Sequence, residues 1–337
     1  MSVAEIVIAF LPIITFLVIM KLMDSFKLLK SRDVGWAIAV GCVVALAALF
    51  FHRDVISLFD ISFETFTRFI SPFSEELLKF IFVIYVIRTY KVGFMVDAAI
   101  LGFAVGAGFA IVENIYYMSY LTDAGILTWF VRGFGTAVLH GGTTAIAAVI
   151  SKDLSDRKKW PLGLIFLPGL LTAVLIHTLF NMFLLPPITM ALLVFMVLPV
   201  LFFITFKQSE KNTREWLGTG LDSDMEMLQI LMSGNIRDSR IGEYLNSIGS
   251  KFSPVIVGDI ICYLRLYLEL SIEVKGMLIL KENGIEPPIL PQVKARLEEL
   301  DYLDSQIGKT GKIAIQPLLK LSNTDLWQIS MMKQNAV

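Results

Sequence analysis

The sequence predicts an all-α membrane protein: a polytopic bundle of about seven transmembrane helices followed by a C-terminal cytoplasmic helical domain. The mean hydropathy of the 337-residue chain is +0.70, which indicates that much of its length lies in a bilayer. Apolar runs of roughly 20 residues, the length that crosses a bilayer, recur up to residue 206. Beyond that point the apolar runs shorten and charged residues become more frequent. We therefore expect residues 1–206 to form the transmembrane bundle and residues 207–337 the cytoplasmic domain.

Each expected span is an apolar run between charged or proline-containing connections. The runs cover residues 3–20, 34–51, 69–87, 96–120, 129–150, 161–185 and 187–206. The first run contains Glu5 and Pro12 and is followed by no small-residue cleavage signature, so we interpret it as a retained span. In the C-terminal domain, apolar residues at helical spacing predict helices over residues 222–232, 236–248, 254–281 and 291–307.

Basic residues are distributed unequally among the connections. They concentrate in the first, third and fifth connections and after the last span, as Lys21, Lys27, Lys30, Arg32, Arg88, Lys91, Lys152, Arg157, Lys158, Lys159, Lys207, Lys211 and Arg214. The positive-inside rule makes these connections cytoplasmic. We therefore expect a protein of the plasma (inner) membrane with its N-terminus outside and its C-terminal domain in the cytoplasm.

Several classes of function are excluded by composition and motif. The formal net charge of -1 gives no indication of a nucleic-acid partner. The tripeptide at residues 308–310 matches the end of a phosphate-binding loop, but Leu303 stands where that loop needs its first glycine, so no nucleotide is expected. The only two cysteines, Cys42 and Cys262, lie too far apart to suggest a disulfide framework or a metal site.

Polar and ionisable residues interrupt four of the expected spans. They are Glu75, Glu76 and Lys79 in the third span, Glu113 and Asn114 in the fourth, His140 in the fifth, and His177 and Asn181 in the sixth. A charged group at this depth costs at least about 2.5–3.5 kcal/mol on insertion scales, so these groups need partners, water or a metal ion. Asn181 follows His177 by one helical turn, and both side chains therefore point the same way.

The predicted topology places these groups at a similar depth. The acidic residues and His177 fall in the outer half of the membrane, and His140 falls near its middle. At about 1.5 Å per residue, all of them fit within a slab roughly 10 Å thick. We therefore predict a single polar cluster inside the bundle, although an internal ion pair between the glutamates and Lys79 would also satisfy part of the pattern.

Such a cluster supports hydrolysis of an amide bond by either of two routes. In the first, Glu76, His140 and His177 hold a zinc ion that activates water, and a second glutamate is the general base. In the second, no metal takes part: a glutamate and a histidine activate water directly, and Asn181 or the other histidine stabilises the oxyanion. Adjacent helical residues project in directions about 100° apart, so one glutamate of the pair faces the cavity more squarely. We favour Glu76 over Glu75.

The sequence fits other functions and other types of amide-hydrolysing membrane protein less well. A proton-coupled transporter or channel also uses intramembrane acids and histidines, but the sequence contains none of the internal repeats that would support one. A non-catalytic membrane sensor would use the cluster only to hold its helices together. The H-E-x-x-H and G-x-S-x-G motifs are absent, and Asp97 has no second intramembrane aspartate to pair with.

Four motifs in consecutive spans resemble those of the PrsW family of intramembrane proteases. They are Glu75-Glu76-x-x-Lys79, Phe109-x-x-x-Glu113-Asn114, His140 and His177-x-x-x-Asn181. The resemblance covers roughly residues 63–206. The family is distantly related to bacteriocin-processing membrane proteases and to the CAAX prenyl endopeptidases. In the prenyl endopeptidases the second motif ends in histidine where this chain has Glu113.

The resemblance implies an intramembrane endopeptidase that cleaves a membrane-anchored protein, such as an anti-sigma factor, on its extracytoplasmic side. It implies that Glu75 and Glu76 are the paired acids, one of them the base. It further implies that Glu113, His140 and His177 bind water or a metal ion, with Asn181 in support. Lys79 and Asn114 are expected to assist. The lipid bilayer and the substrate are the partners that we expect.

Overall fold

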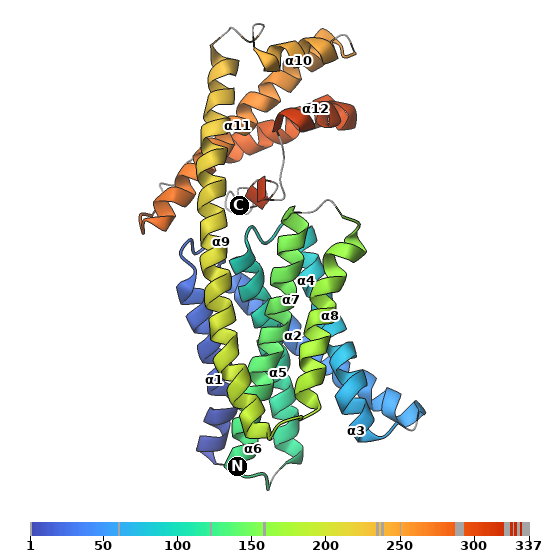
Figure 1. Cartoon of the computed structure of the whole chain (residues 1–337). Helices are drawn as coiled ribbons and strands as arrows, with labels where there is room; N and C mark the ends of the chain where they lie inside the picture. Colours follow the sequence, from blue (N-terminus) through green and yellow to red (C-terminus); the bar gives the residue numbers. More distant parts are fainter. Residues whose placement is uncertain are drawn as a thin grey trace. The chain divides into compact units, whose positions relative to one another are not determined.

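The computed structural model describes residues 2–59, 61–121, 123–157, 160–233, 236, 239–249, 251–286, 293–319, 324–325, 327–328 and 331. These residues form helices joined by short connections, and no strand occurs among them (Figure 1). The predicted all-α fold is confirmed. The chain divides into two compact units, Met1–Ser209 and Glu210–Val337.

The first unit is a bundle of long apolar helices. It contains α1 (Val3–Met23), α2 (Ser31–Phe59), α3 (Phe63–Thr65), α4 (Ser71–Arg88), α5 (Met95–Tyr120), α6 (Ile126–Phe130), α7 (Val138–Arg157), α8 (Leu162–Asn181) and the start of α9 (Pro187–Met232). Within the described part of the chain, six helical segments are long and apolar enough to cross a membrane. The third predicted span corresponds to α4, which has 18 residues and carries three buried charged side chains.

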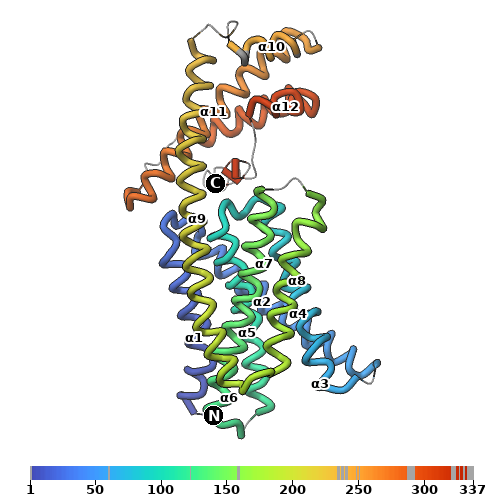
Figure 2. Tube along the Cα trace, in the orientation of Figure 1, coloured from blue at the N-terminus to red at the C-terminus, as the bar shows by residue number. Residues whose placement is uncertain are grey.

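Helix α5 forms the centre of this bundle and contacts α1, α2, α4 and α7 (Figure 2). Glycine residues allow the close approach. A Cβ atom at Gly106 would lie 2.1 Å from the carbonyl oxygen of His140 on α7, and one at Gly108 would lie 2.0 Å from that of Ile38 on α2. Gly102, one turn before Gly106, packs against α7 in the same way. Small residues at this spacing are typical of tightly packed membrane helices.

Two short π-helical segments occur in the bundle: η1 (Phe66–Ile70) leads into α4, and η2 (Val131–Ala137) leads into α7. Segments of this kind are often found at functional sites, because the extra residue per turn redirects side chains and backbone groups. Gly133 of η2 lies against α1, where an added Cβ atom would be 2.0 Å from the carbonyl oxygen of Ile8. Each of the two segments lies directly before a helix that carries predicted site residues.

The second unit consists of the C-terminal part of α9 with α10 (Arg240–Gly249), α11 (Pro254–Glu282) and α12 (Val293–Leu319). Its buried side chains include Leu264, Leu268 and Leu297. Lys275 of α11 is also buried, and its Nζ lies 2.6 Å from Oδ2 of Asp224 on α9. The helix predicted over residues 254–281 corresponds to α11.

Candidate active site

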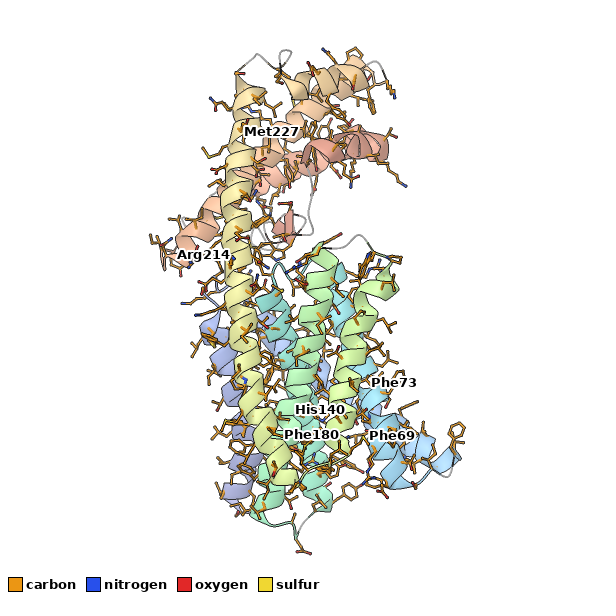
Figure 3. All side chains as sticks on the ribbon, viewed as in Figure 1. Phe69, Phe73, His140, Phe180, Arg214 and Met227 are labelled. Carbon is orange, nitrogen blue, oxygen red and sulfur yellow. The ribbon has the colours of Figure 1, made fainter. Side chains whose placement is uncertain are left out.

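Four helices of the first unit bring the predicted polar residues into one cluster. Glu75 and Glu76 come from α4, Glu113 from α5, His140 from α7 and His177 from α8. Hydrogen bonds and close ion pairs join each of them to at least one other member. His140 lies inside the bundle (Figure 3). The single buried cluster expected from the sequence is therefore present.

Glu76 forms the centre of a buried charged network. Its Oε1 accepts hydrogen bonds from Nζ of Lys79 at 2.6 Å and from Oγ1 of Thr143 at 3.0 Å, and it lies 2.8 Å from Nδ1 of His177. The side chains of Glu76 and Lys79 are 1% and 0% exposed. Because a carboxylate can only accept, Nδ1 of His177 is the donor in its hydrogen bond with Glu76.

His140 is held between a cation and an anion. Its Nδ1 lies 3.2 Å from Nζ of Lys79, and its Nε2 lies 2.8 Å from Oε2 of Glu113. An ammonium group can only donate, so Nδ1 accepts from Lys79 and Nε2 donates to Glu113. The ring is thereby fixed in one orientation.

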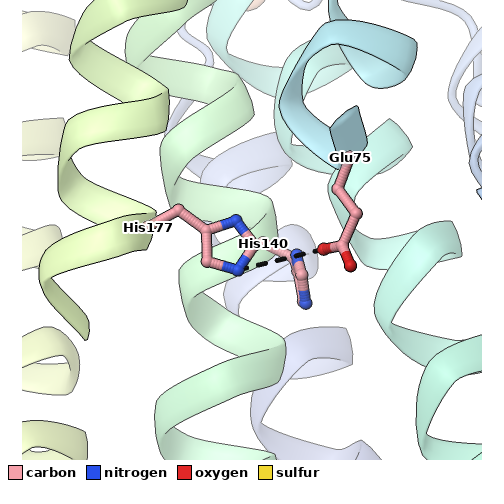
Figure 4. Close-up of side chains that lie close together, drawn as sticks. All are labelled: Glu75, His140 and His177. Atoms are coloured by element: carbon pink, nitrogen blue, oxygen red, sulfur yellow. Dashed lines mark ion pairs between the residues drawn. The ribbon is translucent and has the colours of Figure 1, made fainter. Parts of the chain in front are cut away.

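A cavity of about 330 Å³ opens beside the cluster. Its lining includes His52, Glu75, Glu113, Arg132, His140, His177 and Asn181, with apolar and aromatic side chains of α2, α5 and η1. Glu75 lines this cavity and Glu76 does not. Oε2 of Glu75 lies 3.9 Å from Nε2 of His177 (Figure 4), and Oε1 of Glu75 accepts a hydrogen bond from Ser71.

The donor set fits a zinc ion. Glu75, His140 and His177 are buried and can each offer one ligand atom, and these atoms lie within 4.8 Å of one another. Two imidazoles and one carboxylate are a common set for zinc in a catalytic site. The contact from Glu76 to His177 is of the kind that orients a metal-binding histidine. Both ring nitrogens of His140 make contacts with protein groups. A metal ion bound to His140 would therefore replace either Lys79 or Glu113 as the partner of one nitrogen. The sequence favoured Glu76 as the carboxylate ligand, whereas the geometry favours Glu75.

The two asparagines hold helices in place. Nδ2 of Asn181 donates to the carbonyl oxygen of Thr67 in η1 at 2.9 Å, and Asn181 also lines the cavity. Nδ2 of Asn114 donates to the carbonyl oxygen of Ala9 in α1 at 3.0 Å. Each asparagine therefore fixes a neighbouring segment, and Asn181 does so at the edge of the cavity.

Sequence reasoning missed two basic residues that line the cavity. His52 was expected outside a span, but α2 continues to Phe59, and Nε2 of His52 lies 2.8 Å from Oγ of Ser74. Arg132 lies on η2, and its Nη2 is 3.4 Å from Oε2 of Glu113. Arg132 falls inside the predicted span 129–150, so the rule that singled out the buried acids applies to it as well.

The Glu76–Lys79 pair gives a direct test of this network. Glu76→Gln is expected to lower the free energy of unfolding by about 3–5 kcal/mol, because the Lys79 ammonium would remain buried without a counter-charge. Glu76→Gln/Lys79→Met removes both charges and is expected to recover most of that loss. Thermal unfolding of the purified proteins in one detergent makes the comparison. Equal stability of wild type and the single variant would contradict the ion-pair assignment.

The site lies in a region that matches a known protein family. A family model described as "PrsW family intramembrane metalloprotease" matches residues 32–206, more than half of the chain. The matched region contains every residue that lines the cavity. No match is found among curated proteins or among solved structures.

Proposed function

The chain belongs to the PrsW family of intramembrane metalloproteases, and from this premise we propose that it hydrolyses a peptide bond of a membrane-anchored protein at the cavity beside Glu75, His140 and His177. The observation that carries the proposal is the convergence of these three buried side chains on one cavity within a bundle of apolar helices. A purely structural polar network does not need an open space beside it.

The residues divide the chemistry among them. Glu75, His140 and His177 would hold zinc, which when bound lowers the pKa of a water molecule and polarises the substrate carbonyl. Glu113, the other carboxylate that lines the cavity, accepts the proton of the attacking water, in place of the Glu75/Glu76 pair that the sequence indicated. The water oxygen bonds to the carbonyl carbon, and the π electrons of the carbonyl group move to the carbonyl oxygen. The carbon–nitrogen bond then breaks, and the proton passes from Glu113 to the leaving amine.

Hydrogen bonding within the substrate restricts the conformation that can be cut. A helical segment keeps its carbonyl groups in hydrogen bonds, away from an attacking water. The substrate would therefore present an extended or unwound segment.

Such a segment is available where a transmembrane helix ends. The charge pattern of the connections supports an extracytoplasmic position for the cavity, with the C-terminal unit in the cytoplasm and the protein in the plasma membrane. A single-span protein cut on its outer side would release a signal in the manner of anti-sigma-factor proteolysis. We propose a regulatory protein of this kind as the substrate.

A comparison of membrane-protein fragments tests this function. Cells that make the wild type are compared with cells that make His177→Ala, with Glu64→Gln as a control because Glu64 is exposed and lies outside the cavity. All three proteins must be present in the membrane at equal abundance. We expect single-span proteins to accumulate uncut only with His177→Ala. Identical fragments in all three strains would contradict proteolysis, and ion flux in liposomes would then favour a proton-coupled transporter.

A further inference from the structure

Arg132 is a cationic group that lines the cavity but neither holds the proposed zinc ion nor carries the proton of the attacking water. It lies on η2, the π-helical segment that leads into α7 and His140. Its side chain is 12% exposed. It lines the cavity together with Glu75, His140 and His177. Burying a guanidinium group in this position costs free energy. That cost is offset only if the group is well paired in the protein or binds a ligand.

The guanidinium is held in place from α5. Its Nε donates to Oδ1 of Asn114 at 3.0 Å, and its Cζ lies 3.8 Å from the ring centroid of Tyr117. Its Nη2 lies 3.4 Å from Oε2 of Glu113. Positions 113, 114 and 117 share one side of α5, since residues four apart lie one turn from each other. The orientation of Arg132 is therefore fixed before any substrate binds.

This arrangement leaves donor capacity unused. Nη2 of Arg132 is buried, and among the described residues it has no partner with hydrogen-bond geometry, despite its proximity to Glu113. A guanidinium has five N–H groups, and the hydrogen bond to Asn114 uses one of them. A buried donor without a partner costs about 1–3 kcal/mol, and more when charged. Such groups call for an explanation, and a catalytic role is one that native structures show.

We propose that Arg132 is a catalytic residue that binds the carbonyl oxygen of the scissile peptide bond and stabilises the negative charge on it when water adds. The inference rests on the proposed function and assigns one further group of the same site. The electron pair that leaves the carbonyl π bond comes to rest on this oxygen, and a hydrogen bond from a guanidinium is strongest at that stage. A donor that is oriented in advance lowers the barrier without reorganising.

The structure also assigns Asn114 and Tyr117 as positioning residues. Asn114 acts on the substrate only through Arg132, because its amide is used by Ala9 on one side and Arg132 on the other. Replacing Asn114 by alanine keeps the guanidinium in the chain but removes the hydrogen bond that orients it. The loss of rate should therefore be smaller than the loss on removing Arg132 itself.

The test uses the full-length protein in liposomes, with a fluorescent peptide that covers a cleavage site found in the fragment comparison. Arg132→Gln is expected to lower kcat by about 10²–10³-fold, the effect of removing one oxyanion donor, with KM little changed. Arg132→Lys should give an intermediate kcat, because it keeps the charge but not the planar fork. Millimolar guanidinium added to Arg132→Ala should restore part of kcat, which a structural role would not allow. Zinc content should match the wild type, and thermal stability should fall by less than it does for Glu76→Gln, because Glu113 keeps its hydrogen bond with His140.

Three results would overturn the role of Arg132 and are distinguishable. An unchanged kcat for Arg132→Gln beside an active wild type would refute it and leave the proposed function standing. A fall in kcat accompanied by loss of zinc or of thermal stability, without guanidinium rescue, would make Arg132 a structural residue. A wild type that cleaves no membrane protein would refute the proposed function and this role together.

Discussion

Replacing Glu75 by glutamine is expected to lower kcat for peptide cleavage by about 10²–10⁴-fold, because it removes a ligand of the proposed zinc ion or, in the metal-free route, the group that activates water. Glutamine is similar in size and its amide oxygen can still accept the hydrogen bond from Ser71, so the protein should remain folded. The measurement is kcat of the purified variant, together with the zinc bound per chain. Glu64→Gln, which alters an exposed carboxylate on α3, is the matched control and should behave as the wild type.

The zinc measurement separates the two chemical routes. If zinc holds the attacking water, Glu75→Gln should lose both metal and activity, and 1,10-phenanthroline should inactivate the wild type. If the wild type is active without zinc, the loss of activity in Glu75→Gln points to direct activation of water by this carboxylate. If Glu75→Gln is fully active and Glu76→Gln/Lys79→Met is inactive, Glu76 is instead the carboxylate that takes part in the reaction.

Gly106→Ala is expected to abolish measurable cleavage and to destabilise the bundle. The added Cβ would lie 2.1 Å from the carbonyl oxygen of His140 and 2.5 Å from its carbonyl carbon, and backbone atoms of a helix cannot turn aside. Helices α5 and α7 must therefore separate, at a cost of about 1–3 kcal/mol or more. A displacement of about 1 Å at a catalytic group can lower the rate 10²-fold.

Gly163→Ala provides the control for this prediction. Gly163 lies on α8, and an added Cβ there would meet no atom within 4 Å. Thermal unfolding and peptide cleavage are measured for both variants in parallel. Gly163→Ala should match the wild type in both assays. Wild-type stability for Gly106→Ala would show that α5 and α7 do not pack as closely as described.

Much of the fold follows from the sequence because the bilayer imposes a simple rule on helix length and polarity. The expected apolar runs correspond to helices of the bundle, and the all-α class is confirmed. Helix ends were less predictable. The run expected to end at residue 51 continues as a helix to Phe59, because polar and charged residues beyond the apolar zone keep helical geometry. The π-helical segments have no pattern by which the sequence could reveal them.

The polar cluster was also predictable, since buried charges must find partners. Its internal arrangement was not, because the rotation of each helix about its axis is set by packing. Thus Glu75 lines the cavity, whereas Glu76 faces Lys79, Thr143 and His177. The roles given to these residues remain predictions. Arg132 was detectable by the same reasoning as the acids, but His52 required knowledge of where α2 ends.

The anchoring of Asn114 to Ala9 has a consequence for the minimal active protein. The match to the family model begins at residue 32, whereas Ala9 belongs to α1, which precedes it. Through Asn114, the backbone of α1 sets the position of the Arg132 guanidinium, and α1 also packs against Gly133. If Arg132 acts as proposed, the catalytic unit therefore extends beyond the matched region. A fragment limited to residues 32–206 would keep every residue of the cavity but lose the support that orients Arg132.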